Sequence, residues 1–527
     1  MENNDKKNRP KPVVLIVLDG WGLGEKNKGN AIFNAKLPTF KKLDQFYPHI
    51  ALQASGISVG LPWGEPGNSE VGHMTLGAGK VIYQNMPRIT MSIQDGQFFE
   101  NPTLLKAMKK AKSTGSSLHI MGLVSKGSVH SNIDHLFALL ELAKKENLKN
   151  VFIHVFTDGR DSAPISGAES IKELQLKIDQ FGIGKIASVS GRYFSMDRNN
   201  NWDRIKKAYD SIVNGIGDKI DDPEKYLRDS YKNGVYDEYI EPAVICSGEE
   251  PIGRIKEGDS VIFFNYREDR ARQLTKAFVI PGFSKFSAEN FKNLSFATMT
   301  QYEKNLPAEV AFPPVEIKEC LGKTLGEKKF SQLRIAETEK FAHVTYFFNG
   351  GNEEPFPKED RLIIPSKDVS RFDEVPEMSA HEITDKVVEN IEKDKYDFIL
   401  MNFANADIIG HTGNEKAAIE AIEIIDECME KIIQLVLSKK GCLLITADHG
   451  NVEEMMNTHT GERETEHSIN PVPLWYVTPE NHREKPQKES LPNVAGLLSD
   501  VAPTILEIMG IEKSPEMTGE SLLEMLK

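Results

Sequence analysis

The chain has 527 residues, of which 39% are hydrophobic and 27% are charged, and its formal net charge is -14. Such a length allows two to four domains, and the negative charge excludes a general binder of nucleic acid or of anionic membranes, which needs a basic surface. The four cysteines form no CxxC pair, so neither a zinc ribbon nor a disulfide framework is indicated. We expect a cytoplasmic protein, because the polar N-terminus and the short apolar run after it fit neither a secretion signal nor a membrane anchor.

The first predicted element is a buried strand at Val13–Leu18, where the apolar run VVLIVL ends in Asp19-Gly20. A continuous apolar run of this length is typical of a parallel strand in an α/β sheet. Asp19 would then lie at the carboxyl end of the strand, where such sheets hold their ligands. An Asp-Gly turn explains this Asp equally well when it is considered alone.

Ser69 lies in the stretch PGNSEVGH, a glycine-bracketed turn that leads into a short helical segment. At such a place Ser most often caps a helix. Beside two cations, however, its hydroxyl would be ionised and would attack phosphorus. This second interpretation depends on metal ligands elsewhere in the chain.

Residues 84–317 are predicted to form a second α/β domain, inserted into a first domain made of residues 1–83 and 318–527. Apolar runs of strand length alternate in the insertion with segments of helical spacing. The expected strands are 119–124, 151–156, 186–190 and 261–265, and the expected helices are 137–145 and 205–213.

The predicted strands of the insertion are all followed by polar side chains of similar kinds. Single arginines after strands are usually solvated or paired, but five at successive strand ends favour an anionic substrate that carries a phosphate. Guanidinium groups bind phosphate and carboxylate through two parallel hydrogen bonds. The residues concerned are His130, Arg160, Asp161, Arg192, Arg198, Arg267 and Arg270.

After the insertion, residues 343–348 are predicted to form a strand. Lys340, just before it, could reach the crevice, although exposure to solvent is the commoner fate of a Lys. Residues 397–402 are predicted to form a further strand, and beyond its end Asp407 and His411 are four positions apart. One helical turn would place both on the same face, as a metal chelate requires.

The stretch LLITADHGN, residues 443–451, predicts a buried strand that stops at Asp448 and His449. A helix-capping Asp followed by an exposed His would explain this pair alone. Together with the other strand ends, and with His467 in a later loop, the pair supplies oxygen and nitrogen ligands that suit borderline divalent cations. Three Asp, three His and the Ser69 hydroxyl are enough for two cations, and a two-metal site stabilises in-line phosphoryl transfer.

The chain contains in order LDGWG, GNSEVGH, HSNIDH, TDGRD, GRYFSMDR, FFNYREDRARQ, AETEKFAHVTYFFNGG, NFANADIIGHTG, TADHGN and EHS. With these motifs it resembles the cofactor-independent (2,3-bisphosphoglycerate-independent) phosphoglycerate mutases of the alkaline phosphatase superfamily. The resemblance implies an α/β fold with an alkaline-phosphatase-like metal-binding domain and an inserted phosphotransferase domain. It also implies a glycolytic isomerase that interconverts 3-phosphoglycerate and 2-phosphoglycerate through a phosphoserine, without 2,3-bisphosphoglycerate.

The resemblance further implies a role for each candidate residue. Ser69 matches the nucleophile, Asp161 the general acid and base, and Lys340 a catalytic residue near the phosphoserine. The remaining matches are Asp407, His411 and His467 for one Mn²⁺, with Co²⁺ or Zn²⁺ as alternatives; Asp19, Ser69, Asp448 and His449 for the other; His130, Arg160, Arg192 and Arg198 for the glycerate part; and Arg267, Arg270 and Lys340 for the phosphate. The departures from the family pattern, Ala406, Phe194-Ser195 and Glu268, affect no implied ligand.

Two alternatives remain open. A metal-dependent phosphatase or another phosphomutase of the same superfamily would keep the metal ligands but would not need Asp161 and the arginines. A catalytically inactive binding protein predicts loss of the nucleophile or of a ligand, and neither is lost. We expect a monomer that acts on a small molecule, with no nucleic-acid or membrane partner, and with an inserted domain that closes over the metals to exclude water.

Overall fold

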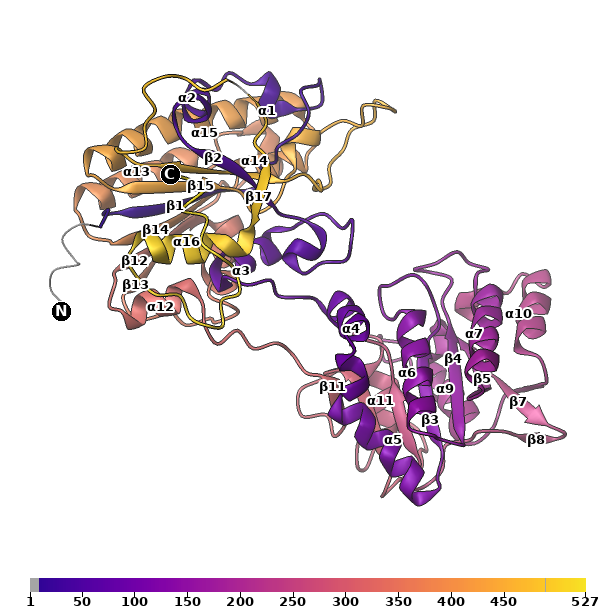
Figure 1. Cartoon of the computed structure of the whole chain (residues 1–527). Helices are drawn as coiled ribbons and strands as arrows, with labels where there is room; N and C mark the ends of the chain where they lie inside the picture. The colour runs from indigo at the N-terminus through magenta and orange to yellow at the C-terminus, as the bar shows by residue number, and fades with distance from the viewer. Residues whose placement is uncertain (1–8, 489) are drawn as a thin grey trace. The chain divides into compact units, whose positions relative to one another are not determined.

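The structure is a computed structural model that describes residues 9–488 and 490–527 (Figure 1). The chain divides into two compact units, of which unit 1 comprises Met1–Gln84 and Val315–Lys527 and unit 2 comprises Asn85–Pro314. Unit 2 is therefore an insertion in the sequence of unit 1, and each unit is built on its own sheet. The predicted fold class, α/β with an inserted α/β domain, is confirmed.

Unit 1 contains an eight-stranded sheet with the strand order β13-β12-β14-β1-β15-β16-β2-β17. Strand β1 pairs in parallel with both β14 and β15, so segments from the two ends of the sequence lie side by side (Figure 1). These three strands are buried along their whole length, which explains their uninterrupted apolar sequences. The strands are β1 (Val13–Leu18), β2 (His49–Gln53), β12 (Gln332–Glu337), β13 (Glu359–Ile364), β14 (Phe398–Phe403), β15 (Cys442–Thr446), β16 (Val472–Val477) and β17 (Val494–Leu497).

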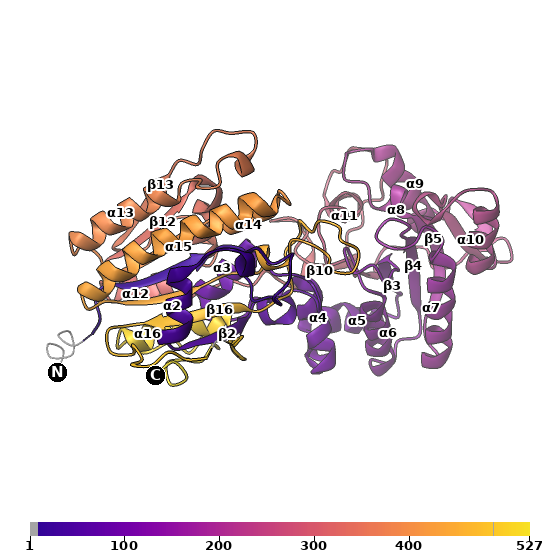
Figure 2. The ribbon, with the colours of Figure 1, turned by 90° about the horizontal axis from the view of Figure 1, so that it is seen from above.

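Helices cover both faces of the unit 1 sheet (Figures 1 and 2). Helices α2, α13 and α15 lie on one face, whereas α3, α12 and α16 lie on the other. No helix in the described parts of the chain is long and apolar enough to cross a membrane. The helices of unit 1 are α1 (Ala31–Asn34), α2 (Pro38–Phe46), α3 (Ser69–Ala78), α12 (Leu321–Glu327), α13 (Ala380–Glu392), α14 (Asn405–Gly410), α15 (Glu415–Ser438) and α16 (Val501–Ile508).

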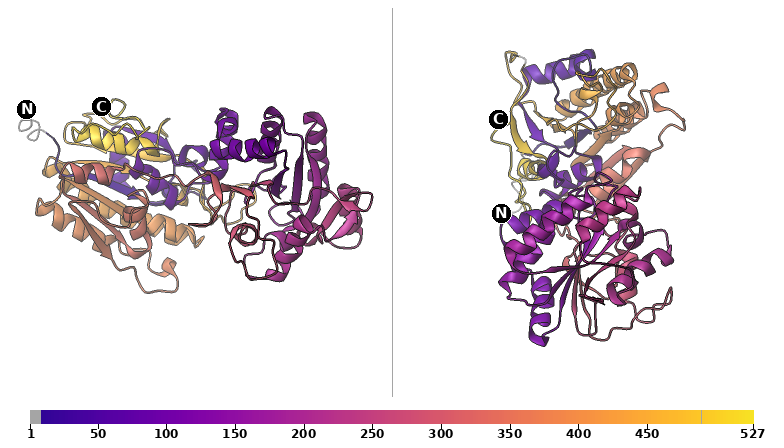
Figure 3. Two further views of the ribbon diagram at one scale, coloured as in Figure 1. Left: turned by 90° about the horizontal axis from the view of Figure 1, so that it is seen from below. Right: turned by 90° about the vertical axis from the view of Figure 1, so that its right-hand side faces the viewer.

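Unit 2 contains a second, mostly parallel sheet with the strand order β11-β10-β9-β3-β4-β5-β7-β6, and β8 pairs with β7. Helices lie on both of its faces (Figure 3). The four strands and two helices predicted there are confirmed, with bounds that differ by a few residues. The elements are β3 (Leu118–Leu123), β4 (Val151–Thr157), β5 (Lys185–Gly191), β6 (Asp218–Ile220), β7 (Ala243–Ser247), β8 (Glu250–Pro251), β9 (Ser260–Phe263), β10 (Ser295–Thr300), β11 (Glu309–Phe312), α4 (Asn85–Gln94), α5 (Pro102–Thr114), α6 (Ile133–Lys145), α7 (Gly167–Phe181), α8 (Arg192–Ser195), α9 (Trp202–Val213), α10 (Pro223–Lys232) and α11 (Arg272–Val279).

The strand predicted at residues 343–348 is wrong. The segment forms a π-helix, η6 (His343–Phe347), directly after the short 3-10 helix η5 (Thr338–Lys340). Strand β12, which precedes it, already pairs with β13 on one side and β14 on the other, so this segment cannot pair with the strand that it follows. Its backbone groups are paired locally instead, for example by the Phe348 amide, which donates to the His343 carbonyl at 3.1 Å.

Helix α3 carries Ser69 as its first residue, because the preceding Asn68 caps it by accepting a hydrogen bond from the Val71 amide at 3.0 Å. Near the other end of α3, Gly77 packs against the backbone of Phe348. A Cβ atom at Gly77 would lie 1.9 Å from the Phe348 carbonyl oxygen. The missing side chain therefore lets η6 lie against α3, and this contact brings the neighbouring Lys340 to Ser69.

We predict that Gly77→Ala destabilises the protein. In an ordinary helix interior this change stabilises by about 0.5–1 kcal/mol, but here the added methyl group must displace a backbone carbonyl, which costs about 1–3 kcal/mol. Thermal unfolding of the variant should show a lower midpoint than that of the wild type. A higher midpoint would contradict the close packing of η6 on α3.

The core of unit 2 contains several buried histidines. His119 Nδ1 lies 3.1 Å from His154 Nε2, and His119 Nε2 lies 3.2 Å from an Asp259 carboxylate oxygen. His135, on α6, is fully buried with its Nε2 atom 2.9 Å from the Thr90 hydroxyl. Burial lowers the pKa of all three, and that of His135 to about 3.

These histidines should make unit 2 sensitive to acid. An imidazole that is neutral when folded stabilises fully above its unfolded pKa of about 6.5, and its contribution is lost as the pH falls toward the folded pKa. For His135 the loss at pH 5 is about 2 kcal/mol. We predict that His135→Gln reduces the difference in unfolding free energy between pH 8 and pH 5 by this amount, measured by hydrogen exchange of peptides from unit 2. An unchanged difference would contradict the burial of a neutral imidazole.

Candidate functional site

Three parallel strands of unit 1 deliver the predicted metal ligands to one edge of the sheet. Asp19 follows β1, Asp448 and His449 follow β15, and Asp407 lies on α14 directly after β14. The register of β1 with β14 and β15 aligns their carboxyl ends, so residues far apart in the sequence meet. Asp19, Asp448 and His449 are completely buried. Polar residues in such a place need partners that satisfy their charge.

Asp407, His411 and His467 form the more open part of this centre. Asp407 Oδ1 lies 3.3 Å from His411 Nε2 and 3.1 Å from His467 Nε2, and the two Nε2 atoms are 3.0 Å apart. The His411 side chain is 43% exposed and that of His467 is 17% exposed. The four-residue spacing of Asp407 and His411 therefore brings the two side chains together, as a one-turn chelate would require.

The tautomers of the three candidate histidines fit a metal. Nδ1 of His411 lies 2.7 Å from the Thr465 carbonyl, Nδ1 of His467 lies 2.8 Å from the Gly67 carbonyl, and Nδ1 of His449 lies 3.2 Å from that of Gly450. A carbonyl oxygen only accepts, so each Nδ1 donates its proton, and Nε2 is the atom left to bind a metal or, without one, a second proton. Metal-binding histidines typically use this arrangement. The Nε2 atoms of His411 and His467, 3.0 Å apart, repel unless a proton or a metal cation lies between them.

Ser69, Asp19, His449 and Lys340 form the deeper part of the centre. The Ser69 hydroxyl lies 3.1 Å from Asp19 Oδ1, 3.0 Å from His449 Nε2 and 2.7 Å from Lys340 Nζ. Lys340 Nζ also donates to Asp19 at 2.7 Å and to Asp407 at 2.6 Å. Lys340, for which solvent exposure is the commoner fate, is thus buried and holds the Ser69 hydroxyl and two carboxylates together.

The charges of this centre are coupled. Burial opposes the ionised form of Lys340, but Asp19 and Asp407 outweigh it and raise its pKa. Likewise Lys340 holds the pKa of both carboxyl groups low in spite of their burial. Burial also opposes protonation of His449, yet Asp448 and Asp19 raise its pKa to about 9. The carboxylates of Asp19, Asp407 and Asp448 therefore stabilise the charged forms of Lys340 and His449.

The donor set has room for cations. Asp448 Oδ2 is buried and accepts no hydrogen bond among the described residues, and an unsatisfied carboxylate oxygen in a protein interior needs a cation or a donor. Among the described residues, three groups of carboxylates and imidazoles have ligand atoms within 4.8 Å of one another, namely Asp407 with His411 and His467, Asp19 with Asp407 and His449, and Asp19 with His73 and Asp448. Hard oxygen atoms combined with imidazole suit borderline divalent ions.

In unit 2 the predicted substrate residues gather at the ends of neighbouring parallel strands. Arg192 donates to Asp161 at 2.5 Å, and His130 Nε2 lies 3.9 Å from the same carboxylate. Burial, followed by the positive charges of Arg192, Arg198 and Arg160, lowers the pKa of Arg270. Burial, followed by Arg192, lowers the pKa of His130 to about 4, so this imidazole is neutral at pH 7.

Two carboxylates that the sequence does not single out organise this arginine cluster. Asp158 accepts from Arg192 at 2.6 Å, from the Ser125 hydroxyl at 2.6 Å and from the Asp161 amide at 3.0 Å. Asp269 accepts from Arg198 at 2.7 Å. Both lie within motifs recognised in the sequence, but their role as internal partners follows only from the folded geometry.

The remaining arginine of the cluster, Arg267, has its Nε atom 3.3 Å from Asp269 Oδ1. Glu268, the sequence departure between Arg267 and Arg270, pairs with Arg272 at 3.4 Å. The glutamate thus has a cationic partner outside the predicted substrate-binding set. Its charge does not remove either predicted substrate arginine from the cluster.

Two further residues of unit 1 were missed by the sequence reasoning. His73 and Asn402 are completely buried beside Asp19 and Asp448, and Asn402 Nδ2 donates to Asp19 Oδ2 at 2.7 Å. Signals were present, because His73 lies one helical turn after Ser69 and Asn402 is a polar residue near the end of an apolar strand. Spacing alone does not show what they contact.

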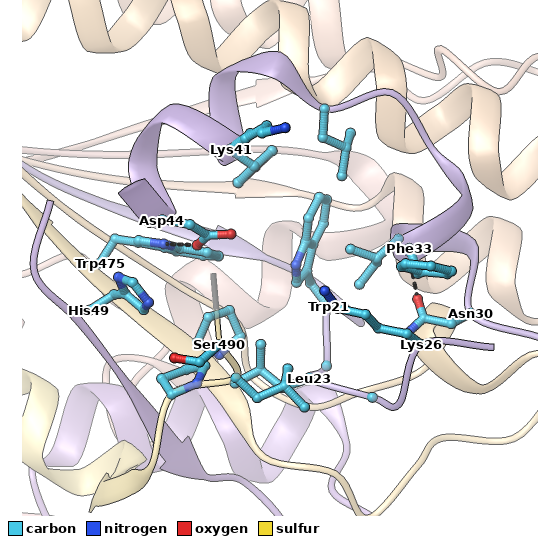
Figure 4. A pocket seen from close by; sticks show the side chains of 18 of the residues that line it. Trp21, Leu23, Lys26, Asn30, Phe33, Lys41, Asp44, His49, Trp475 and Ser490 are labelled. Carbon is cyan, nitrogen blue, oxygen red and sulfur yellow. Dashed lines mark hydrogen bonds between the residues drawn. The ribbon is translucent and has the colours of Figure 1, made fainter. Parts of the chain in front are cut away.

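A cavity of about 330 Å³ lies beside the loop that follows Asp19 (Figure 4). Trp21 packs on Phe40 with ring centroids 4.4 Å apart, and Phe40 packs on Trp475 at 5.6 Å. The Trp475 indole donates to Asp44 at 2.9 Å. None of the predicted metal ligands lines this cavity. The aromatic packing instead holds Trp21, and with it the loop that begins at Asp19.

A serine hydroxyl at a helix N-terminus, surrounded by buried carboxylates and imidazoles at the carboxyl edge of a parallel sheet, defines the metal-dependent phosphoryl-transfer class of α/β proteins. Comparison with known proteins narrows this class. Residues 89–304 match the family described as BPG-independent PGAM N-terminus.

Proteins named 2,3-bisphosphoglycerate-independent phosphoglycerate mutase from Clostridium perfringens and Moorella thermoacetica are each 49% identical over 514 residues. These alignments cover 97% of this chain and 99% and 98% of the relatives. A crystal structure of Leishmania mexicana phosphoglycerate mutase at low cobalt concentration is 29% identical, with a TM-score of 0.52 and 98% of both chains covered. The chain therefore belongs to the 2,3-bisphosphoglycerate-independent phosphoglycerate mutase family.

We predict that Lys340→Met destabilises the metal-free protein by about 3 kcal/mol, because it leaves buried carboxylates without their cation. In Mn²⁺ the loss should be much smaller, since bound cations neutralise the same carboxylates. Thermal unfolding in a chelator and in Mn²⁺ measures both. The control is Lys323→Met, which removes a partly exposed ion pair with Glu319 and should cost less than about 1 kcal/mol in either condition. Equal losses for Lys340→Met in both conditions would contradict a shared charge balance.

Proposed function

We propose that this chain interconverts 3-phosphoglycerate and 2-phosphoglycerate through a phosphoserine at Ser69, without 2,3-bisphosphoglycerate. The observation that carries the proposal is the position of the Ser69 hydroxyl, within 3.1 Å of Asp19, His449 and Lys340. A hydroxyl in these surroundings is a nucleophile rather than a helix cap. Membership of the mutase family supports the same reaction.

The donors of unit 1 fit two divalent cations, for which we propose Mn²⁺, with Co²⁺ or Zn²⁺ as alternatives. Asp407, His411 and His467 would hold one, and Asp19, Ser69, Asp448 and His449 would hold the other. When bound, the cations supply positive charge that stabilises the ionised serine and the transferring phosphoryl group.

The residues around Ser69 assist the transfer directly. Lys340 donates to the Ser69 hydroxyl at 2.7 Å, and its raised pKa keeps it charged, so it favours the ionised form of the serine. Ser69 is also the first residue of the ten-residue helix α3. The dipole of this helix favours negative charge at its first residue and would thus stabilise a phosphoryl group on Ser69.

The cluster of unit 2 fits the rest of the substrate. We propose that Arg160, Arg192, Arg198 and His130 hold the glycerate part and that Arg267 and Arg270 bind the phosphate, because forked guanidinium groups match both anions. Asp161, held by Arg192 at 2.5 Å, is the proposed base and acid for the glycerate hydroxyls. A neutral His130 can donate or accept a hydrogen bond without adding charge.

A phosphatase of the same superfamily is the second candidate. It would use the same metal ligands, but it would have no need for a carboxylate tied to a cluster of arginines in a separate unit. The contacts of Asp161, Arg192 and Asp158 therefore favour the mutase. We also propose that the protein is a cytoplasmic monomer whose partner is the small-molecule substrate. Its net charge of -14 disfavours binding to nucleic acids or anionic membranes.

The decisive experiment incubates the Mn²⁺-loaded protein with 3-phosphoglycerate and no bisphosphoglycerate, removes the metal with a chelator and records a phosphorus NMR spectrum. We expect 2-phosphoglycerate without free phosphate. Free phosphate alone would establish the phosphatase, and an unchanged spectrum would overturn both enzymes.

Ser69→Ala should lower the rate of conversion by about 10³-fold or more, because loss of a nucleophile removes the covalent route. Ser438→Ala, at the exposed end of α15, is the matched control and should leave the rate unchanged. Mass spectrometry of the wild type after acid quenching should find a phosphoryl group on Ser69. Full activity of Ser69→Ala would exclude the phosphoserine.

A further inference from the structure

A chain of hydrogen bonds runs from the Asp19 carboxylate to the backbone of Ser69. Asn402 Nδ2 donates to Asp19 Oδ2 at 2.7 Å and lies 3.1 Å from His73 Nε2. On the other side of the ring, His73 Nδ1 lies 2.9 Å from the Ser69 carbonyl, and it is also 3.1 Å from Asp448 Oδ2. Asp19, Asn402, His73 and Asp448 are all completely buried. Asn402 and His73 thus link Asp19 to the backbone of Ser69, with Asp448 beside the last link.

The direction of every proton in this chain is fixed by its neighbours. Asp19 is a carboxylate and only accepts, so the Asn402 atom beside it must be the amide nitrogen. The second hydrogen of that nitrogen is donated to His73 Nε2, which therefore carries a lone pair. The Ser69 carbonyl only accepts as well, so His73 Nδ1 must carry the proton. His73 is thereby held as one neutral tautomer.

The contacts of His73 argue against it as a metal ligand. Atoms of Asp19, His73 and Asp448 lie within 4.8 Å of one another, which is compatible with a metal site. Yet the lone pair of Nε2 is already used by Asn402, and Nδ1 carries a hydrogen. The Nδ1 atoms of His411, His449 and His467 also face carbonyls, but their Nε2 atoms face carboxylates of the centre and not an amide donor.

We propose that His73 and Asn402 are positioning residues for the cation site that contains Ser69, an inference that rests on the proposed function. Asn402 orients Asp19, while the His73 N–H group fixes the first turn of α3 and lies against the Asp448 carboxylate. Ser69 and the two proposed ligands, Asp19 and Asp448, are thereby held in fixed positions relative to one another. Outer partners of this kind typically change metal affinity by about 10- to 100-fold.

The effect should be confined to one of the two cations. Among the described residues, the polar contacts given for His73 and Asn402 reach Asp19, Asp448 and Ser69, but not Asp407, His411 or His467. The more open site therefore provides an internal reference. A change that merely loosens the fold would weaken both sites, whereas loss of positioning weakens one.

Two substitutions distinguish the roles of the two ring nitrogen atoms of His73. The amide nitrogen of Asn can take the place of Nδ1, so His73→Asn keeps the donor to the Ser69 carbonyl, beside Asp448. The amide of Gln reaches the position of Nε2, so His73→Gln keeps a contact with Asn402 but loses that donor. The test is calorimetric titration of each metal-free, full-length variant with Mn²⁺. His381→Gln, beside Cys428 and away from the centre, is the matched control.

We expect His73→Gln to weaken one of the two Mn²⁺ sites by about 10- to 100-fold, with the second site, the control and His73→Asn within about threefold of the wild type. Wild-type affinity in His73→Gln would overturn the positioning role. Equal losses in His73→Asn and His73→Gln would also overturn it and indicate a direct ligand. Equal weakening of both sites would reduce His73 to a role in folding and likewise overturn the inference.

The same titration separates this inference from the proposed function. A wild type that binds two Mn²⁺ ions and forms 2-phosphoglycerate, with His73→Gln unchanged, removes the positioning role and leaves the mutase intact. A wild type that binds fewer than two ions overturns the two-metal function, and with it the positioning role.

Discussion

The repulsion among Asp19, Asp407 and Asp448 is the constraint on which unit 1 depends. The parallel register of β1 with its two neighbours places these carboxylates at one buried edge, where water cannot screen them. Two cationic side chains of the protein partly neutralise them. Lys340 comes from η5, which follows β12, and His449 takes up a proton through its pKa of about 9. The close packing of η6 on α3, and hence the glycine at position 77, follows from the need to bring that lysine to Ser69.

Unit 2 contains an excess of positive charge, which is stabilised by internal partners of the opposite sign. Guanidinium groups crowd at its strand ends, and the carboxylates of Asp158 and Asp269 hold them apart and orient them. Each unit therefore contains a concentration of one charge, kept stable by a few internal partners of the other sign. The anionic substrate and the divalent cations that we propose would neutralise the remaining charge of unit 2 and unit 1, respectively. The proposed binding of cations by unit 1 and of an anionic substrate by unit 2 thus follows from the sign of the charge that each unit concentrates.

Much of this could be predicted from the sequence, because buried parallel strands have uninterrupted apolar runs and because their ends carry unusual polar residues. The first strand, the inserted α/β domain and the family were all predicted correctly. The strand at 343–348 was wrong, since its β-branched and aromatic residues say nothing about whether a sheet edge is free. The contacts of Lys340, His73, Asn402 and Asp158 could not be predicted, because they depend on the register between strands that are distant in the sequence.

The two halves of the metal centre differ in their access to solvent. His411 is nearly half exposed, whereas Asp19, Asp448 and His449 are completely enclosed. In the two-cation arrangement that we propose, an ion held by the outer group would therefore exchange with the medium faster than an ion held by the inner group. The order in which metals are supplied, and not only their concentration, would then affect which ions the protein contains.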